Sequence, residues 1–299
     1  MLEMKNVTKI FGGFKALDDL NLHVPQGAVY GLVGPNGAGK STAIRHLTGV
    51  YRPDSGEVNL QGKPVYENPQ AKAKIGYIPD DVFYYPSATM EDMRKFYQGL
   101  YPTFDQVLYK RLDEVFHLPQ RSPIRRFSKG MQKQAAFHLT VCLRPEVLIL
   151  DEPVDGLDPV MRRQVMSMIL SDVADCGSTV LISSHNLREL EDVCDHVGIL
   201  SHGKVLVERS LSDLQENLVK MQVVFQEKEL PQLPADMEVL HVSHVGRIHT
   251  LIIRGTPTDV TNRLAVYAPI LLEALPLSLE EIFIYELGGD DYAVKDIVL

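Results

Sequence analysis

The sequence has few cysteines, no excess of positive charge and no long hydrophobic run. Its three cysteines are odd in number and form no CxxC pair, which predicts reduced thiols in a cytosolic setting. Thirty Lys and Arg against 39 Asp and Glu give a net charge of −9, which argues against a nucleic-acid partner. No apolar run approaches the ~18–20 residues that cross a bilayer, and the first residues contain no apolar signal core. We therefore expect a soluble, acidic, intracellular protein.

What the sequence does contain is an alternation of short apolar runs with longer helix-like stretches. The runs are bounded by turn residues and are typical of strands buried on both faces, as in a parallel sheet covered by helices. This pattern predicts an α/β fold. The expected strands are residues 28–33, 147–150, 179–183 and 197–200, and the expected helices are residues 41–50, 159–174 and 186–194.

Two stretches differ from this alternation. Residues 83–116 hold nine of the 12 Tyr and 10 Phe of the chain and predict a mostly helical insertion. We expect Tyr84, Tyr85 and Tyr101 to lie at the surface of this insertion, because a tyrosine hydroxyl can hydrogen-bond to water. The last eighty residues or so are within the size range of a small α+β domain.

We therefore predict two domains. The first covers residues 1–218, with a helical subdomain at about 83–140, and the second covers residues 219–299. For the end of the chain, the expected strands are residues 221–226, 238–245, 249–254 and 270–275, and the expected helices are residues 211–220, 259–267 and 279–287.

A glycine-rich segment follows the first expected strand and opens a helix, and it matches the P-loop pattern GxxxxGK[ST] in its required context. Its glycines let backbone N–H groups point at phosphate oxygens, and the lysine adds a positive charge at the β- and γ-phosphates. The serine can ligate Mg²⁺. The expected phosphate-binding residues are Gly34, Pro35, Asn36, Gly37, Ala38, Gly39, Lys40, Ser41 and Thr42.

An apolar strand that ends in two carboxylates forms the second half of the expected site. Residues 147–150 precede Asp151, which is therefore placed at the carboxyl edge of the sheet, where it can hold Mg²⁺. Glu152 follows and can polarise a water molecule for attack on the γ-phosphate. Together with the P-loop, these acids indicate a P-loop NTPase.

Further motifs narrow this class, and with them the chain resembles the ATP-binding subunit of an ABC transporter. Residues 127–132 (Phe-Ser-Lys-Gly-Met-Gln) are similar to the signature loop of that family, and residues 155–158 (Asp-Gly-Leu-Asp) are similar to its D-loop. His185 matches the switch histidine, and Phe11 is placed like the adenine-stacking aromatic. The motifs occur in the family's order over about residues 2–210. The resemblance implies an ABC-ATPase cassette with a mostly parallel sheet, an antiparallel β part and a helical subdomain.

The sequence departs from the family pattern at three positions. Lys129 and Met131 stand where the commonest signature loop has Gly and Gln. Asp80 occupies the place of the Q-loop glutamine, which touches Mg²⁺ and lies at the junction with the membrane partner. An aspartate also offers a hard oxygen, so metal contact is retained in principle, but it is shorter and charged. The alternative is that Asp80 only caps the following helix.

The resemblance implies a mechanism in which two chains, either identical or related, pair head to tail around ATP. Each ATP then lies between one P-loop and the partner chain's signature loop, where donors from both sides neutralise the triphosphate. Glu152 orients the water, His185 reads the γ-phosphate and Asp158 bridges the two sites. The implied cofactors are ATP and Mg²⁺. The expected ligands are Ser128, Lys129 and Gly130 for ATP in trans, and Ser41, Asp151 and Asp80 for the metal.

The soluble chain contains no channel, so the resemblance implies a separate multi-span membrane (permease) subunit. The aromatic-rich insertion lies where the family docks that partner, which places the chain peripherally on the cytoplasmic face of the cell membrane. Residues 279–283 (Leu-Glu-Glu-Ile-Phe) resemble the closing helix of exporter-type, or ABC-2-type, members and favour export.

Two other functions share some of these features. A soluble ABC-type ATPase acting on ribosomes or DNA would use the same motifs, but the single P-loop, the short insertion and the negative charge argue against it. A small-molecule kinase would leave the signature loop and His185 without a role. A metal site at His241, His244 and His249 is disfavoured, because positions 241 and 244 face opposite sides of a strand. A loose basic patch around the signature loop is left open: Arg121, Arg125, Arg126, Lys129 and Lys133.

Overall fold

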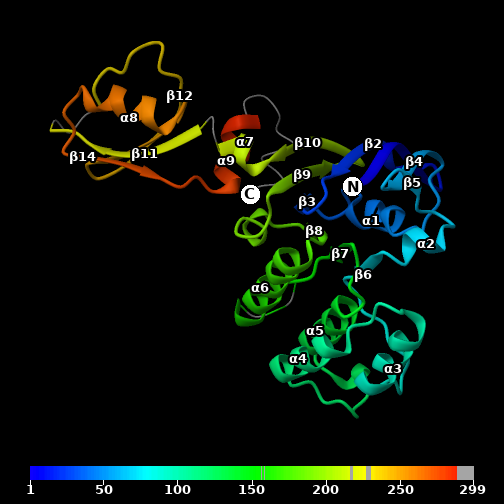
Figure 1. Ribbon diagram of the computed structural model, residues 1–299. Coiled ribbons are helices and arrows are strands. Elements are labelled where there is room, and N and C mark those ends of the chain that lie inside the picture. Colours follow the sequence, from blue (N-terminus) through cyan, green and yellow to red (C-terminus); the bar gives the residue numbers. More distant parts are fainter. Residues whose placement is uncertain (156, 158, 216–217, 227–229, 288–299) are drawn as a thin grey trace. The chain divides into compact units, whose positions relative to one another are not determined.

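The computed structural model describes residues 1–155, 157, 159–215, 218–226 and 230–287, and its contacts divide the chain into two compact units (Figure 1). The first unit is Met1–Glu208 and the second begins at Arg209. The predicted boundary lies later, after residue 218. The difference arises because helix α7 (Leu211–Gln215) contacts β11 (Leu218–Val224) and α9 (Leu279–Leu287), which belong to the second unit.

A largely parallel sheet forms the centre of the first unit. Its strand order is β10-β9-β3-β8-β7-β6, and β9, β3, β8, β7 and β6 run parallel to their neighbours. Strands β3, β7 and β8 are buried along their whole length, as expected from their uninterrupted apolar runs. The bounds are β3 Val29–Val33, β6 Ile75–Ile78, β7 Val147–Asp151, β8 Thr179–Ser184, β9 His196–Ser201 and β10 Lys204–Ser210.

A second, antiparallel sheet has the order β2-β1-β4-β5. Helix α1 (Lys40–Leu47) lies between the two sheets, because its buried residues Ala43, Ile44 and Leu47 join one hydrophobic core with residues of both. The sequence analysis predicted this helix to continue to residue 50, but it is capped at Thr48 and the chain then turns at Gly49. The strands are β1 Leu2–Phe11, β2 Phe14–Val24, β4 Ser55–Leu60 and β5 Lys63–Pro64, followed by the short helix α2 Pro69–Lys72.

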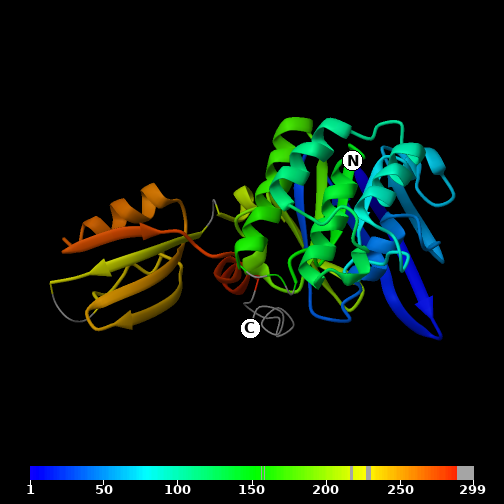
Figure 2. The same cartoon turned by 90° about the horizontal axis from the view of Figure 1, so that it is seen from below.

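The helical subdomain was predicted at about residues 83–140, and its helices lie together on one side of the first unit (Figures 1 and 2). Their N-caps are typical: Thr89 forms a capping box with Asp92, and Asp105 and Ser128 accept backbone N–H groups. Helix α5 contacts both α4 and strand β6, and it therefore joins the subdomain to the central sheet. The helices are α3 Met90–Leu100, α4 Gln106–Phe116, the 3-10 turn η1 Ile124–Arg126, and α5 Lys129–Val141.

The helix predicted at residues 159–174 is confirmed as α6 (Pro159–Cys176). This helix contacts strand β8. The helix predicted at 186–194 is wrong, because this segment forms only a 3-10 turn, η2 (Leu187–Glu189). Its backbone bonds span three residues, as from the Leu190 amide to the Leu187 carbonyl, and the chain then continues in turns. Four side chains of this segment are nevertheless buried: Leu187, Leu190, Val193 and Cys194.

The second unit has its own antiparallel sheet, with strand order β12-β13-β11-β14. Helix α8 (Pro257–Ala265) places Val260 and Leu264 in its core. The predicted helix at 211–220 is wrong in its second half, because the chain from Leu218 onward pairs with β13 and β14. The remaining strands are β12 Val239–Val245, β13 Ile248–Arg254 and β14 Leu271–Leu275.

Candidate active site

The P-loop connects β3 to α1 and has the backbone geometry that its glycines allow. Gly37 and Gly39 adopt φ angles of 84° and 112°, in the region that residues with a side chain rarely adopt. A Cβ at Gly39 would also lie 2.8 Å from the Ala16 carbonyl oxygen. The amide of Ala38 donates to Pro35, and its carbonyl accepts from Gly203. The loop is therefore held in one curled conformation at the amino end of α1.

Lys40 begins helix α1 and is buried. Its Nζ donates to the carbonyl oxygens of Gly34 at 2.6 Å and Pro35 at 3.3 Å, and it lies 3.3 Å from Oε1 of Glu152. The structure thus brings together the predicted phosphate-binding lysine and the predicted catalytic acid, from two segments far apart in the sequence. A buried ammonium with these partners can exchange the carboxylate for a phosphate oxygen.

Asp151 ends strand β7 and is almost fully buried. Its Oδ1 accepts a hydrogen bond from the Ser183 hydroxyl at 2.7 Å. Burial raises the pKa of the Asp151 carboxyl, whereas hydrogen bonds from Ser183 and Ser41 act in the opposite direction. Ser41 and Asp151 therefore lie side by side and present hard oxygen atoms, a donor set that fits Mg²⁺.

Glu152 is held in an unusual backbone conformation, with φ at 48°. Its amide donates to the Ser183 hydroxyl at 3.0 Å, so one serine orders both neighbouring acids. Its Oε2 lies 3.0 Å from Nδ1 of His185, which follows strand β8 and is partly exposed. The predicted base and the predicted switch histidine are in direct contact.

A cavity of about 380 Å³ lies beside the P-loop. It collects most of the residues that the sequence analysis assigned to the site, and two that it missed, Phe14 and Ala16. Phe14 pairs with Phe11 across the Gly12-Gly13 turn, and this pairing could have been read from the hairpin pattern. The lining residues are Phe11, Phe14, Ala16, Pro35, Asn36, Gly37, Gly39, Lys40, Ser41, Thr42, Asp80 and Glu152.

Asp80 follows strand β6 and lines this cavity, although half of its side chain is exposed. The alternative that Asp80 only caps the following helix is wrong, because Thr89 is the N-cap of α3. Its Oδ1 instead lies 3.2 Å from Nζ of Lys133 on helix α5. Lys133 therefore does not belong to a solvated basic patch, whereas Arg125 and Lys129 are exposed.

The signature-loop residues lie elsewhere in the same chain. Ser128 caps helix α5 and accepts the Met131 amide at 3.3 Å, and Ser128 and Lys129 are exposed. Ser128, Lys129 and Gly130 do not line the cavity beside the chain's own P-loop. In the D-loop, Gly156 and Asp158 lie outside the described residues.

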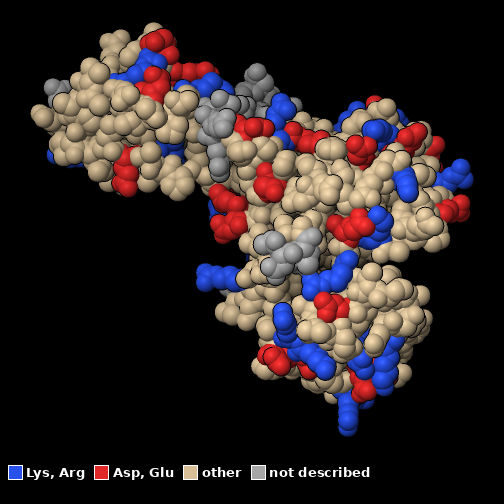
Figure 3. Space-filling model, in the orientation of Figure 1, with Lys and Arg blue, Asp and Glu red and all other residues tan. Residues whose placement is uncertain are grey.

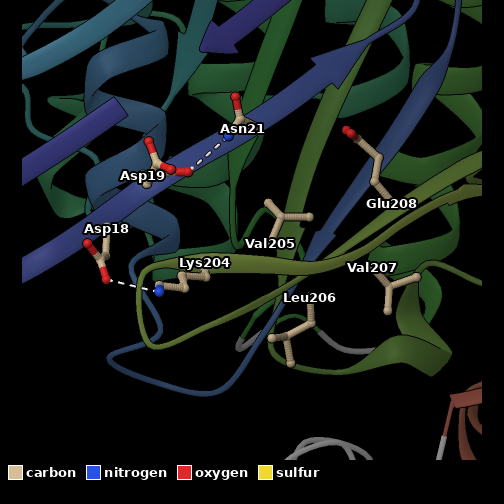
Figure 4. Close-up of a pocket in the computed structure, with 8 residues that line it drawn as sticks. All are labelled: Asp18, Asp19, Asn21, Lys204, Val205, Leu206, Val207 and Glu208. Atoms are coloured by element: carbon tan, nitrogen blue, oxygen red, sulfur yellow. Dashed lines mark hydrogen bonds and ion pairs between the residues drawn. The ribbon is translucent and has the colours of Figure 1, made fainter. Parts of the chain in front are cut away.

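A second cavity, of about 350 Å³, lies between β2 and β10 (Figure 4). Three of its charged groups have partners within the protein: Lys204 Nζ lies 3.1 Å from Oδ2 of Asp18, and Glu208 accepts from the Tyr30 hydroxyl at 2.8 Å. This cavity brings together none of the predicted site residues. Of the three histidines considered for a metal, His244 faces His249, whereas His241 packs on a tyrosine ring.

Comparison with known proteins gives consistent matches. A profile described as ABC transporter matches residues 17–155. The ABC transporter ATP-binding protein YtrB of Bacillus subtilis is 29% identical over 97% of this chain and 99% of its own length. The linearmycin resistance ATP-binding protein LnrL of the same organism is 32% identical over 73% of this chain and 72% of its own. A solved structure described as an ATP-binding subunit of an ABC transporter is 30% identical, with a TM-score of 0.66 over 72% of this chain and 92% of its own.

Proposed function

The chain belongs to the ABC transporter family as an ATP-binding and ATP-hydrolysing subunit, and we propose that two such subunits close around ATP and thereby move a separate membrane-spanning partner. The observation that carries the proposal is the cavity beside the P-loop. Lys40, Ser41, Glu152 and Phe11 all line this one space. The space therefore matches a nucleotide, with its phosphates at the P-loop and its adenine ring on Phe11.

In the proposed reaction Lys40 binds the β- and γ-phosphates, and Glu152 orients the attacking water and accepts its proton. His185 is in contact with Glu152 and is positioned to sense the γ-phosphate. Further backbone N–H groups of the P-loop complete the phosphate cradle. Because Glu152 contacts Lys40 in the free protein, ATP binding releases the carboxylate for the water.

The oxygen atoms of Ser41, Asp151 and Asp80 would hold Mg²⁺, which when bound neutralises part of the charge on the phosphates. The side-by-side placement of Ser41 and the buried Asp151 supports this assignment. Asp80 lines the same cavity and offers a further carboxylate oxygen. Asp80 supplies a charge where a glutamine would supply a neutral oxygen, so this site depends on its surroundings for neutralisation.

The second half of each ATP site comes from another subunit in this proposal. Ser128, Lys129 and Gly130 lie at the amino end of α5, away from the chain's own P-loop cavity, and two of them are exposed. A helix amino end and a lysine suit a phosphate group that arrives from a partner. The pair is either a homodimer or a heterodimer with a related ATPase, and Asp158 is assigned to bridge its two sites.

The membrane partner is proposed to dock on the helical subdomain. Phe83, Tyr85 and Phe96 expose 82%, 72% and 58% of their surface there, and Phe83 and Tyr85 contact each other edge to face. Exposed aromatics are favoured anchors of protein interfaces. Of the tyrosines expected at the surface, Tyr85 is exposed, whereas Tyr84 and Tyr101 are half-buried.

We further propose export as the direction of transport and the cytoplasmic face of the membrane as the location. LnrL is named for linearmycin resistance, and the closing helix at 279–283 resembles that of exporters.

Within the described residues no helix has the length and hydrophobicity to cross a membrane. Acidic and basic side chains are interspersed on the face shown in Figure 3. The relatives are transporter subunits, so a soluble ATPase acting on ribosomes or DNA is not supported.

The variant Glu152→Gln tests the proposed reaction. It should keep ATP affinity but hydrolyse ATP at least ~100-fold more slowly, because the amide cannot accept the proton of the water. It should also double its molar mass in light scattering when Mg-ATP is added, since closed pairs would persist.

Lys40→Ala is the matched control, because it should lose ATP affinity several-fold or more and remain monomeric under the same conditions. If Glu152→Gln hydrolysed ATP at the wild-type rate, Glu152 could not be the residue that accepts the proton of the water. A monomer with ATP, even when the membrane partner is present, would overturn the proposed pairing.

A further inference from the structure

Lys133 lies in the second turn of α5 and connects three segments that the sequence keeps far apart. Its Nζ donates to the carbonyl oxygen of Glu152 at 2.7 Å and to that of Asp155 at 3.1 Å. The same Nζ lies 3.2 Å from Oδ1 of Asp80. A lysine ammonium has three N–H donors, and here each has one acceptor.

Two of these acceptors belong to residues that line the candidate active site, and the third lies three residues after Glu152. Glu152 and Asp155 bracket the loop that carries the proposed base, and Asp80 lines the cavity proposed for the phosphates. Only 11% of the Lys133 side chain is exposed, against 51% for Asp80. The ammonium is therefore partly shielded from water, so its interactions are stronger than those of a surface ion pair.

We propose that Lys133 is a positioning residue for ATP hydrolysis, which neutralises the Asp80 carboxylate beside the phosphates and holds the main chain of the catalytic loop. This inference rests on the proposed function. It gives Lys133 two separable effects. The charge of the ammonium acts on nucleotide affinity through Asp80, and its geometry acts on turnover through the carbonyls of Glu152 and Asp155.

The electrostatic effect follows from the charges at the cavity. A triphosphate carries several negative charges, and a second negative charge in the cavity wall repels it. Lys133 offsets the charge of Asp80 in the free protein. If Mg²⁺ accompanied ATP, the cation would supply that neutralisation at Asp80. The contribution of Lys133 to ATP affinity should therefore be largest when no Mg²⁺ is present.

The test uses Lys133→Met in the full chain, because methionine keeps an unbranched stem and removes the charge. Calorimetric titration with ATP in EDTA should show an affinity about tenfold lower than that of the wild type, since a charge-assisted interaction is lost. Adding Asp80→Asn to this variant should restore that affinity. It should not restore kcat, which should be at least about tenfold lower in both variants because the two carbonyls have lost their donor.

Lys133→Arg separates the two effects further. It keeps the positive charge and should retain ATP affinity in EDTA. Its planar guanidinium cannot point three donors in the directions that an ammonium does, so its kcat should still fall. This variant also keeps the proposal testable if Lys133→Met folds poorly.

Lys110→Met, at an exposed lysine of α4, is the matched control and should behave as the wild type. If Lys133→Met and Lys133→Arg matched this control in EDTA affinity and in kcat, the proposal would be wrong. An affinity loss that Asp80→Asn failed to restore would overturn the neutralising role. Failure of the proposed function is distinguishable, because the wild type itself would then show no ATP hydrolysis sensitive to Lys40→Ala.

Discussion

Most charged side chains of the candidate site have a partner of opposite charge. Lys40 contacts Glu152, and Lys133 contacts Asp80. Asp151 differs, because its hydrogen bonds come from the hydroxyl groups of two serines and the nearby charges of Glu152 and Asp80 are also negative. At the residue scale, the protein therefore keeps an incompletely neutralised buried carboxyl where a cation is proposed to bind.

Asp151→Asn should raise the stability of the nucleotide-free protein at neutral pH by about 1 kcal/mol, because it removes the cost of burying an ionised carboxyl. The pKa of Asp151 is raised in the folded state. The destabilising effect is therefore present above that pKa, and it disappears as the pH falls and the group is protonated. The gain should accordingly shrink at acidic pH, as measured by urea unfolding.

The same Asp151→Asn variant should gain less thermal stability from Mg-ATP than the wild type does, because a proposed metal ligand is lost. Glu280→Gln, a change in the second unit, serves as the charge-matched control. A lower stability of Asp151→Asn at both neutral and acidic pH would contradict the proposed cost of burying an ionised carboxyl at this position.

At the scale of elements, helix α5 contributes residues to more than one part of the first unit. It begins at the signature-loop residue Ser128, carries Lys133 in its second turn, and contacts strand β6. Gly76 on β6 makes that contact close, because a Cβ there would lie 2.9 Å from both the Thr140 Cγ2 and the Pro145 Cγ atoms. Small changes in how α5 packs on β6 should therefore reach the catalytic loop through Lys133.

Gly76→Ala should destabilise the protein by about 1–3 kcal/mol, since the added methyl group forces α5 and β6 apart. It should lower kcat more than ATP affinity. Gly99→Ala is the control, because a Cβ at that position of α3 meets nothing within 4 Å and alanine favours a helix. That change should be neutral or slightly stabilising. Equal effects of the two changes in urea unfolding would contradict the role of close packing at β6.

At the scale of the whole molecule, the chain consists of two units with separate hydrophobic cores. One core joins α1 to both sheets of the first unit, and the other lies between the sheet and α8 of the second unit. The candidate ATP site is built from residues of the first unit alone. Nucleotide binding should therefore stabilise the first unit directly.

Calorimetry should show two unfolding transitions, of which Mg-ATP raises only one. Leu251→Ala, at a fully buried position of the second core, should lower the other transition, because such a change costs about 2–5 kcal/mol. A single transition that ATP and Leu251→Ala both shift would show that the two units unfold together.

Much of the fold was predictable because the pattern of apolar residues carries it. The strands that proved to be β3, β7, β8 and β9 read as uninterrupted apolar runs, and each lies within a residue or two of its predicted bounds. Residues 186–194 show the limit of this approach. A helix was predicted here, but Gly31 lets Leu190 and Cys194 approach β3 closely, and the chain packs there in turns. Tertiary contact thus overrode local helix preference.

The sequence by itself determined the chemistry of this protein, because a P-loop and a strand ending in two acids need only local spacing to be recognised. Only the tertiary structure decided which groups meet. The contacts of Lys133 with Asp80, Glu152 and Asp155 depend on how α5 packs against the central sheet. Such contacts join residues distant in the chain, and no local spacing encodes them.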